Sequence, residues 1–144
     1  MQVQQILNSK TTSDVITINP NSLIVEAIKV LAEKKIGTVI VSFDGISAEG
    51  ILSERDIVRE LAKTGANCLN RTVNELMTKD LQTCESHTSA EEVMQKMIKG
   101  RFRHMPVVNN DKLIGLITLG DAVKARLSEL SMEKDALESM IMGF

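Results

Sequence analysis

The sequence has no tryptophan or tyrosine, and its three aromatic residues are all phenylalanine. Such a chain has few aromatic platforms on which the bases of a single strand can stack. Its formal net charge of −2 gives no general electrostatic reason to bind DNA or RNA. No apolar run approaches the roughly 20 residues that span a membrane. We therefore expect neither a nucleic-acid nor a membrane partner, and a core built from aliphatic residues and methionine.

Cysteine is equally scarce. Cys68 and Cys84 are too far apart for a C-x-x-C metal motif and too few for a disulfide framework. Cys84 is predicted to fill an apolar strand position, whereas Cys68 lies in a loop and is open to exposure. The first residues lack the basic start and long apolar segment of a signal peptide. A reducing, cytoplasmic location fits these features.

Signatures of catalysis and metal binding are missing as well. No spacing of Cys and His supports a zinc site, and neither a P-loop nor a dinucleotide-binding glycine pattern occurs. The two histidines, His87 and His104, have no recognisable nucleophile or acid–base partner. We expect a protein that is not an enzyme and that holds neither a metal nor a catalytic cofactor.

The sequence does contain an internal repeat. A pattern of glycine, two aliphatic residues, serine or threonine, two variable positions and aspartate begins at Gly50 and again at Gly115, 65 positions later. Upstream of this motif the offset is 66 residues, so that Thr17 aligns with Thr83. The extra residue lies in a turn expected around residues 43–45. The hydroxyl and acidic residues of the two motifs are Ser53, Asp56, Thr118 and Asp121.

A hydroxyl residue followed three positions later by an acid predicts a helix start, in which both side chains satisfy free backbone N–H groups. Helix starts also attract anions, because these N–H groups and the helix dipole point the same way. Capping alone is one interpretation of the motif. Its duplication, with a glycine three positions upstream, favours a pair of ligand-binding sites.

Each copy is predicted to fold as strand, helix, strand, strand, helix. In the first copy the strands are residues 15–18, 39–41 and 51–52, and the helices are residues 22–35, capped by Ser22, and 56–63. In the second copy the strands are residues 81–84, 105–108 and 113–117. A helix capped by Thr88 and Glu91 runs to residue 99 and stops at Gly100. Short lead-in helices are expected at residues 3–7 and 73–77.

These elements predict a mixed α/β (α+β) fold of two tandem β-α-β-β-α repeats. Neither repeat has much core alone, so the two sheets should pack face to face around a pseudo-twofold axis with a cleft between them. The expected divisions are residues 1–14 (lead-in helix and linker), 15–64 (first repeat), 65–80 (linker with short helix), 81–124 (second repeat) and 125–144 (helical extension).

The extension is predicted as one helix over residues 122–142, because no glycine or proline interrupts it. Its apolar seam consists of Val123, Leu127, Leu130, Leu137 and Ile141, with Lys134 at the missing step. A helix longer than the domain needs favours packing on a second copy, as a homodimer. The alternative is that it folds back on its own domain.

These residues together resemble a pair of CBS domains, the tandem arrangement called a Bateman module. The resemblance covers residues 15–57 and 81–123. It rests on the duplicated motif, the strand Met105-Pro106-Val107-Val108 and the lead-in segment Leu76-Met77-Thr78. The chain is similar to bacterial stand-alone CBS-pair proteins.

The resemblance implies a regulatory module that binds adenine nucleotides of the AMP/ATP class between its repeats and signals to a regulated protein partner by a conformational change. NAD(H) is the next candidate ligand, because the cleft extends across both copies. A rival interpretation is an interaction protein that acts through its C-terminal helix. In the family the motif Asp holds the ribose hydroxyls, the motif Ser or Thr lies near ribose and phosphate, and the start of the second strand flanks the base. Carried over, the nucleotide-binding candidates are Thr17, Ile36, Gly37, Thr38, Ser53, Arg55, Asp56, Thr83, Phe102, Arg103, His104, Met105, Pro106, Thr118, Gly120 and Asp121.

The two sites are expected to differ. Arg101, Arg103 and His104 offer phosphate contacts at the second strand of the second copy, although solvated charge is the alternative account. The first copy has Gly37-Thr38-Val39-Ile40 there, without basic residues, and this absence favours the interaction protein. Conversely, Gly120 replaces Arg55 in the second motif.

Overall fold

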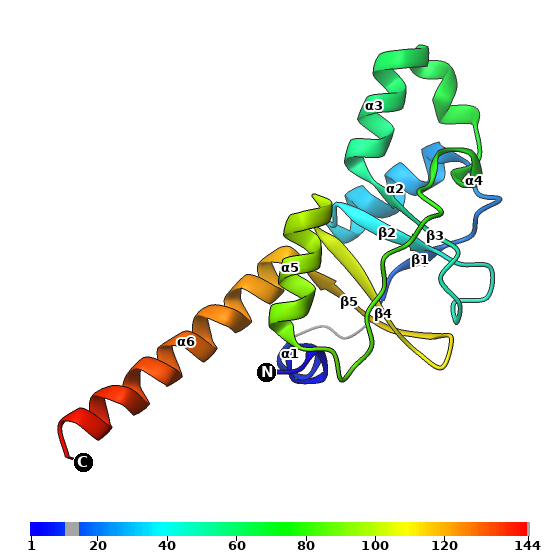
Figure 1. The fold of residues 1–144 in the computed structure, drawn as a ribbon. Coiled ribbons are helices and arrows are strands. Elements are labelled where there is room, and N and C mark those ends of the chain that lie inside the picture. Colours follow the sequence, from blue (N-terminus) through cyan, green and yellow to red (C-terminus); the bar gives the residue numbers. More distant parts are fainter. Residues whose placement is uncertain (11–14, 144) are drawn as a thin grey trace.

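The computed structural model describes residues 1–10 and 15–143, so residues 11–14 of the expected linker and residue 144 of the extension lie outside it. The elements in chain order are α1 (Val3–Ser9), β1 (Thr17–Ile18), α2 (Ile24–Lys34), β2 (Thr38–Val41), β3 (Gly50–Ser53), α3 (Glu54–Thr64), the 3-10 helix η1 (Gly65–Asn70), α4 (Val73–Leu76), α5 (Ala90–Gly100), β4 (His104–Asn109), β5 (Lys112–Thr118) and α6 (Leu119–Ile141). The mixed helix-and-strand fold with a long final helix is confirmed (Figure 1).

The two repeats have related sheets of unequal size. In the first, β1 pairs parallel with β2 and β2 pairs antiparallel with β3. In the second, β4 and β5 form an antiparallel hairpin, and the strand expected at residues 81–84 is reduced to one bridge between Cys84 and Val107. Ile40 donates its N–H to the Ile16 carbonyl oxygen in the first repeat, whereas the equivalent residue, Pro106, has no N–H to donate. The second repeat therefore loses this contact, which accounts for its shorter pairing.

Two expected helix caps are wrong by one residue. The N-cap of α2 is Leu23, and the carbonyl oxygen of Ser22 instead accepts a hydrogen bond from the N–H of Val73. The N-cap of α5 is Ser89, while the Thr88 hydroxyl accepts the N–H of Glu85. The two sites share one feature, since the carbonyl oxygens of Ser22 and Thr88 each accept a backbone N–H from a lead-in helix.

The end of α5 also differs from the expectation. The helix includes Gly100, and Arg101 takes the left-handed conformation with φ 57°. A Cβ atom at Gly100 would lie 2.5 Å from Cε1 of Phe102. This glycine therefore makes room for the Phe102 ring and does not serve as the left-handed C-cap.

The lead-in helices are confirmed as elements, and each packs on the other repeat. Val3 and Ile6 of α1 are buried in the core of the second repeat, together with Val93, Met97 and Ile117. Helix α4 contributes Val73 to the core of the first repeat. Each repeat thus completes its core with a helix that precedes the other repeat in the sequence.

We call this arrangement the exchange of lead-in helices, and backbone hydrogen bonds support it in both halves. The N–H of Val3 donates to the Thr88 carbonyl oxygen over 2.9 Å, and the N–H of Val73 donates to the equivalent oxygen of Ser22 over 2.8 Å. The exchange is therefore a property of the repeat, and it ties the two halves into one unit.

The motif glycines lie where the exchanged segments pass close to the sheets. A Cβ atom at Gly50 would be 2.9 Å from the backbone oxygen of Thr78 and 2.7 Å from Sδ of Met77. At Gly115 it would be 2.6 Å from Cδ2 of Leu7. Only glycine admits such close approach without a shift of the neighbouring segment.

Helix α6 begins on the second repeat and then extends away from it (Figure 1). Ala122 and Ala125 are buried, whereas every residue from 131 to 143 is exposed. The fold-back alternative is therefore not adopted. Among the described residues, none of the helices combines the length and apolar character needed to cross a membrane.

Truncating Ile6 is expected to destabilise the second repeat, although this residue lies at the start of the chain. Ile6 is 4% exposed, and Ile→Ala at a buried site costs about 2–5 kcal/mol. Urea unfolding of Ile6→Ala measures the loss, and hydrogen exchange of β4 amides locates it. The matched control is Ile46→Ala, at a residue that is 50% exposed. If Ile6→Ala lowers the free energy of unfolding no more than the control does, α1 does not stabilise the second repeat.

Alanine at the two motif glycines is expected to have unequal effects. Gly50→Ala meets the Thr78 backbone, and such overpacking costs about 1–3 kcal/mol. Gly115→Ala meets the end of the Leu7 side chain, which can rotate, so its cost should be smaller. Thermal unfolding of both variants tests this order, and an equal or reversed order would show that the approach of Thr78 does not limit position 50.

Candidate functional site

Both motifs form the same helix start. The Ser53 N–H donates to Asp56 Oδ2 over 2.9 Å, and the Asp56 N–H donates to the Ser53 hydroxyl oxygen over 3.2 Å. Thr118 and Asp121 repeat this pair of bonds at 2.9 and 3.0 Å. Both motifs therefore cap their helices, and each carboxylate retains acceptor capacity for a ligand as well.

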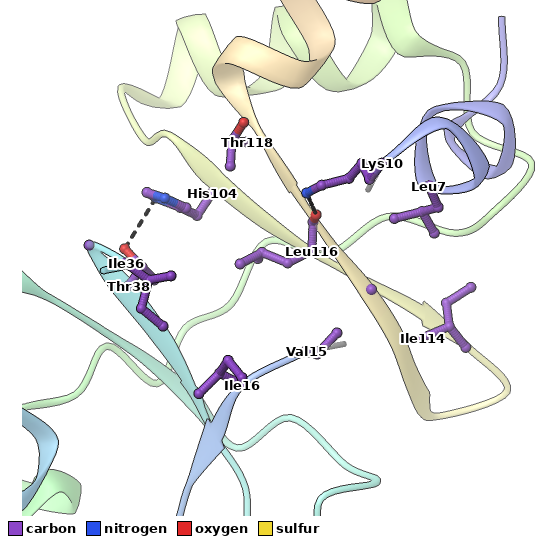
Figure 2. A pocket seen from close by; sticks show the side chains of 12 residues that line it. Leu7, Lys10, Val15, Ile16, Ile36, Thr38, His104, Ile114, Leu116 and Thr118 are labelled. Atoms are coloured by element: carbon purple, nitrogen blue, oxygen red, sulfur yellow. Dashed lines mark hydrogen bonds between the residues drawn. The ribbon is translucent and has the colours of Figure 1, made fainter. Parts of the chain in front are cut away.

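The two halves meet at equivalent residues. Thr38 pairs with Ser53 in the first sheet, and His104 pairs with Thr118 in the second. The Thr38 hydroxyl lies 3.3 Å from Nδ1 of His104, a contact drawn as a dashed line in Figure 2. Because Thr38 and His104 occupy the same position of the repeat, their contact marks the pseudo-twofold relation between the halves.

One cleft opens on each side of this contact. The Asp56 cleft has a volume of about 380 Å³. It is lined by both repeats, at Gly37, Thr38, Ile51, Ser53, Glu54, Arg55, Asp56, Arg59, Thr78, Arg101, Phe102, Arg103 and His104. The volume falls within the range usual for small-molecule sites.

The charge of the Asp56 cleft corrects an expectation from the sequence. The first motif was expected to lack basic neighbours, because its own strand start has none. The structure instead brings Arg101 and Arg103 of the second repeat beside Asp56, where Arg55 and Arg59 also lie. Four arginines thus face two carboxylates, those of Glu54 and Asp56. The basic cluster of one repeat serves the motif of the other.

The second cleft, called the Thr118 cleft, is smaller and mostly apolar (Figure 2). Its volume is about 270 Å³. It is lined by Leu7, Lys10, Val15, Ile16, Ile36, Gly37, Thr38, His104, Ile114, Gly115, Leu116 and Thr118. Its aliphatic walls suit a flat apolar group better than a phosphate chain.

Lys10 supplies the cation nearest the second motif. Its Nζ donates to Asp121 Oδ2 and to the Leu116 carbonyl oxygen, both over 2.9 Å. Burial raises the pKa of Asp121, but the hydrogen bonds from Thr118 and Lys10 outweigh it and hold the pKa below its usual value. Asp121 is therefore ionised and already paired, and it lies in a neighbouring hollow that Lys10 also lines.

His104 lines both clefts and has a perturbed protonation equilibrium. Burial lowers its pKa, the carboxylate of Asp121 raises it, and the cations of Lys10 and Arg103 lower it further. The net shift is downward, so the ring is neutral at neutral pH. One neutral imidazole therefore separates the two clefts.

Several candidates lie outside both clefts. Met105 and Pro106 are buried in β4, and Thr17 pairs with Ile40 inside the first sheet. Thr83 lines a separate hollow, and Gly120 lines another beside α6. The two clefts contain the other candidates except Asp121.

Some lining residues were not among the candidates. Leu7 lies in the exchanged helix α1 and Lys10 is its C-cap, and the sequence contains no signal that this helix reaches the other repeat. Arg59 was detectable, because it lies three residues after Asp56 and donates to its Oδ1 over 3.1 Å. Leu116 was detectable as an aliphatic position of the second motif, and Ile114 lies two residues before it on β5.

Both cysteines are buried, which excludes exposure of Cys68. Burial raises the pKa of Cys84 to about 11, so its thiol is protonated and unreactive at neutral pH. Within residues 1–10 and 15–143, no group of three or more His, Cys, Asp or Glu side chains is placed to hold a metal ion.

Acidification is expected to weaken the fold through His104. Because burial lowers the pKa of His104 in the folded state, this side chain takes up a proton near pH 6.5 in the unfolded chain and at a lower pH in the folded one. The unfolded state then binds more protons, so the free energy of unfolding decreases from about pH 8 to about pH 5.5. Urea unfolding at both pH values measures the decrease. His104→Asn should reduce it and the exposed-site control His87→Asn should not; equal decreases in all three proteins contradict this role.

Comparisons with known proteins agree with this architecture. The family model described as "CBS domain" matches residues 3–63 and 73–128. The crystal structure of the CBS-domain containing protein ATU1752 from Agrobacterium tumefaciens superposes with a TM-score of 0.82 at 39% identity, covering 88% of this chain and 99% of that one. The CBS domain pair of protein MJ0100, solved with 5-methylthioadenosine and S-adenosyl-L-methionine, has a TM-score of 0.77 at 25% identity, covering 90% and 98% of the two chains.

A relative in Arabidopsis thaliana is the CBS domain-containing protein CBSCBSPB1, which is 30% identical over 135 residues. The match covers 91% of this chain and 25% of the relative, so this chain spans a quarter of that protein's length. Since the family model matches both repeats, the chain belongs to the CBS-domain family and folds as a CBS-domain pair.

Proposed function

We propose that this CBS-domain pair is a sensor that binds an adenine nucleotide of the AMP/ATP class in the Asp56 cleft and signals occupancy to a protein partner. One observation carries the proposal. The cleft combines a ribose-type acceptor, a helix start and four arginines drawn from both repeats. The binding of adenosine-containing ligands by the MJ0100 pair supports the ligand class.

Asp56 is suited to ribose. Its Oδ2 accepts the Ser53 N–H, and its Oδ1 accepts from Arg59, whose side chain is 70% exposed. An exposed ion pair contributes at most about 1 kcal/mol, so two ribose hydroxyls can replace Arg59 at small cost. A carboxylate accepts both hydroxyls of one ribose ring.

The arginines favour a phosphate-bearing ligand over a bare nucleoside. Arg55, Arg101 and Arg103 are exposed at the rim, where a guanidinium can donate two parallel hydrogen bonds to one phosphate. The start of α3 adds free N–H groups of the same polarity. Ribose would then lie at Asp56 and the phosphates toward the rim.

The signal would arise because the walls of the cleft belong to different repeats. A nucleotide that contacts Asp56 of the first repeat and Arg103 of the second binds best at one relative orientation. Binding therefore shifts the population toward that orientation by the difference in affinity. A regulated partner that contacts both repeats would detect the shift.

A dinucleotide of the NAD(H) class is the second candidate. Gly37, Thr38 and His104 line both clefts, so a ligand with two nucleoside halves can bridge them. We further propose that the chain is not an enzyme, since the sequence contains no recognisable acid–base constellation and His104 is the one histidine that lines either cleft. Chromatography of AMP, ATP or NADH incubated with pure protein tests this, and turnover would contradict it.

Asp56→Asn is expected to weaken AMP and ATP binding at least tenfold, because a neutral amide loses the charge-assisted bonds to ribose. Asparagine retains an acceptor for the Ser53 N–H, so the helix start should persist. Isothermal titration measures affinity, and circular dichroism checks the fold. The control Asp135→Asn changes an exposed acid on α6.

The same titrations with adenosine separate the two halves of the site. Adenosine should lose affinity in Asp56→Asn as AMP does, because both carry the ribose. Undiminished AMP affinity in a folded Asp56→Asn variant would refute binding at this cleft. If the wild-type protein binds NADH but not AMP, the ligand is a dinucleotide and not a mononucleotide.

A further inference from the structure

Helix α6 presents an apolar stripe, interrupted by Lys134, that remains largely exposed among the described residues of its own chain. Leu127, Leu130, Leu137 and Ile141 are 63%, 48%, 58% and 83% exposed. Burial of apolar surface contributes about 25 cal/mol per Å², so a stripe of this length favours association strongly. The question is which surface covers it.

The stripe has the spacing of a coiled-coil seam. Its positions are Val123, Leu127, Leu130, Lys134, Leu137 and Ile141. They alternate by four and three residues, which is the a/d pattern of a heptad repeat. The fitting occupant is therefore another helix with the same repeat, and this chain supplies one itself.

We propose that α6 forms an antiparallel two-helix coiled coil with α6 of a second copy, centred on Met132. In this register Val123 faces Ile141 of the second copy, Leu127 faces Leu137, and Leu130 faces Lys134. Every seam position of one helix thus faces a seam position of the other, so the seam can pair with an antiparallel copy of itself.

Charge selects the antiparallel arrangement over the parallel one. A parallel pair would place Lys134 beside the Lys134 of its mate in the apolar seam, and Glu133 beside Glu138 on the flanks. The antiparallel pair separates the two lysines and places each Lys124 beside a Glu138 of the second copy. One like-charge contact, between the two Glu133 side chains, remains at the solvated edge, where salt screens it.

The interface would reach the ligand-binding region. Val123 and Leu127 line a hollow of about 580 Å³ together with His104, Thr118 and Gly120. Since Ile141 of the second copy faces Val123, the end of the second α6 would cover this hollow. His104 and Thr118 also line the Thr118 cleft, so the second copy would lie directly behind its wall.

The proposal does not depend on nucleotide binding, and its test uses the full chain without nucleotide. Sedimentation velocity should show a dimer. Leu137→Lys should raise the dimer dissociation constant at least a hundredfold, because it places a charge opposite Leu127. The control Met132→Lys changes a residue of similar exposure, 63%, on the outer face of the helix and should leave the dimer intact.

Disulfide crosslinking determines the orientation. Glu133→Cys should crosslink under mild oxidation, because the two copies of residue 133 meet near the centre. Leu127→Cys should not, because ten residues of helix, about 15 Å, separate its copies along the axis. The unsubstituted chain, whose two cysteines are buried, is the blank. A monomeric wild type, a dimer insensitive to Leu137→Lys, or crosslinking at Leu127→Cys would each overturn the proposal.

Discussion

The exchange of lead-in helices is the constraint on which the rest of the structure depends. A repeat of about 60 residues buries so little apolar surface that it is marginally stable alone. Here Val3 and Ile6 complete the second core and Val73 completes the first. Each half therefore needs a segment attached to the other. The exchange therefore fixes the position of the two sheets relative to each other. The exchanged segments pass so close to Gly50 and Gly115 that a side chain at either position would meet them.

Because the two repeats are held in a fixed position relative to each other, both of them contribute residues to each cleft. Thr38 and His104, equivalent by sequence, touch across the junction and separate two clefts that are lined by both halves. A duplication produces two similar clefts only while the two sequences stay alike. Arginines at positions 101 and 103, with no counterpart near Gly37, make the Asp56 cleft cationic and leave the Thr118 cleft apolar. Divergence in one repeat thus altered the site of the other.

The sequence predicted what depends on local chemistry and missed what depends on pairing across the junction. Ser53–Asp56 and Thr118–Asp121 are helix starts because the bonds that define them span three residues. The prediction of a strand at residues 81–84 was wrong, because pairing there needs a backbone N–H donor at position 106, and Pro106 has none. The basic cluster was assigned to the wrong motif, since alignment of repeats shows which residues are equivalent and not which ones face each other.

The two motif carboxylates differ most in the cation that a ligand must displace. Arg59, on the same helix as Asp56, is 70% exposed, so water already competes for its charge. Lys10 is 27% exposed, follows directly after the exchanged helix α1 as its C-cap, and also donates to the Leu116 carbonyl oxygen. Removing Lys10 would leave the partly buried Asp121 carboxylate with the Thr118 N–H as its remaining donor and would take the Lys10 donor from the Leu116 oxygen, which costs more than releasing a surface arginine. The second site is therefore held closed by the same segment that completes the second core, and a ligand reaches the first carboxylate at lower cost.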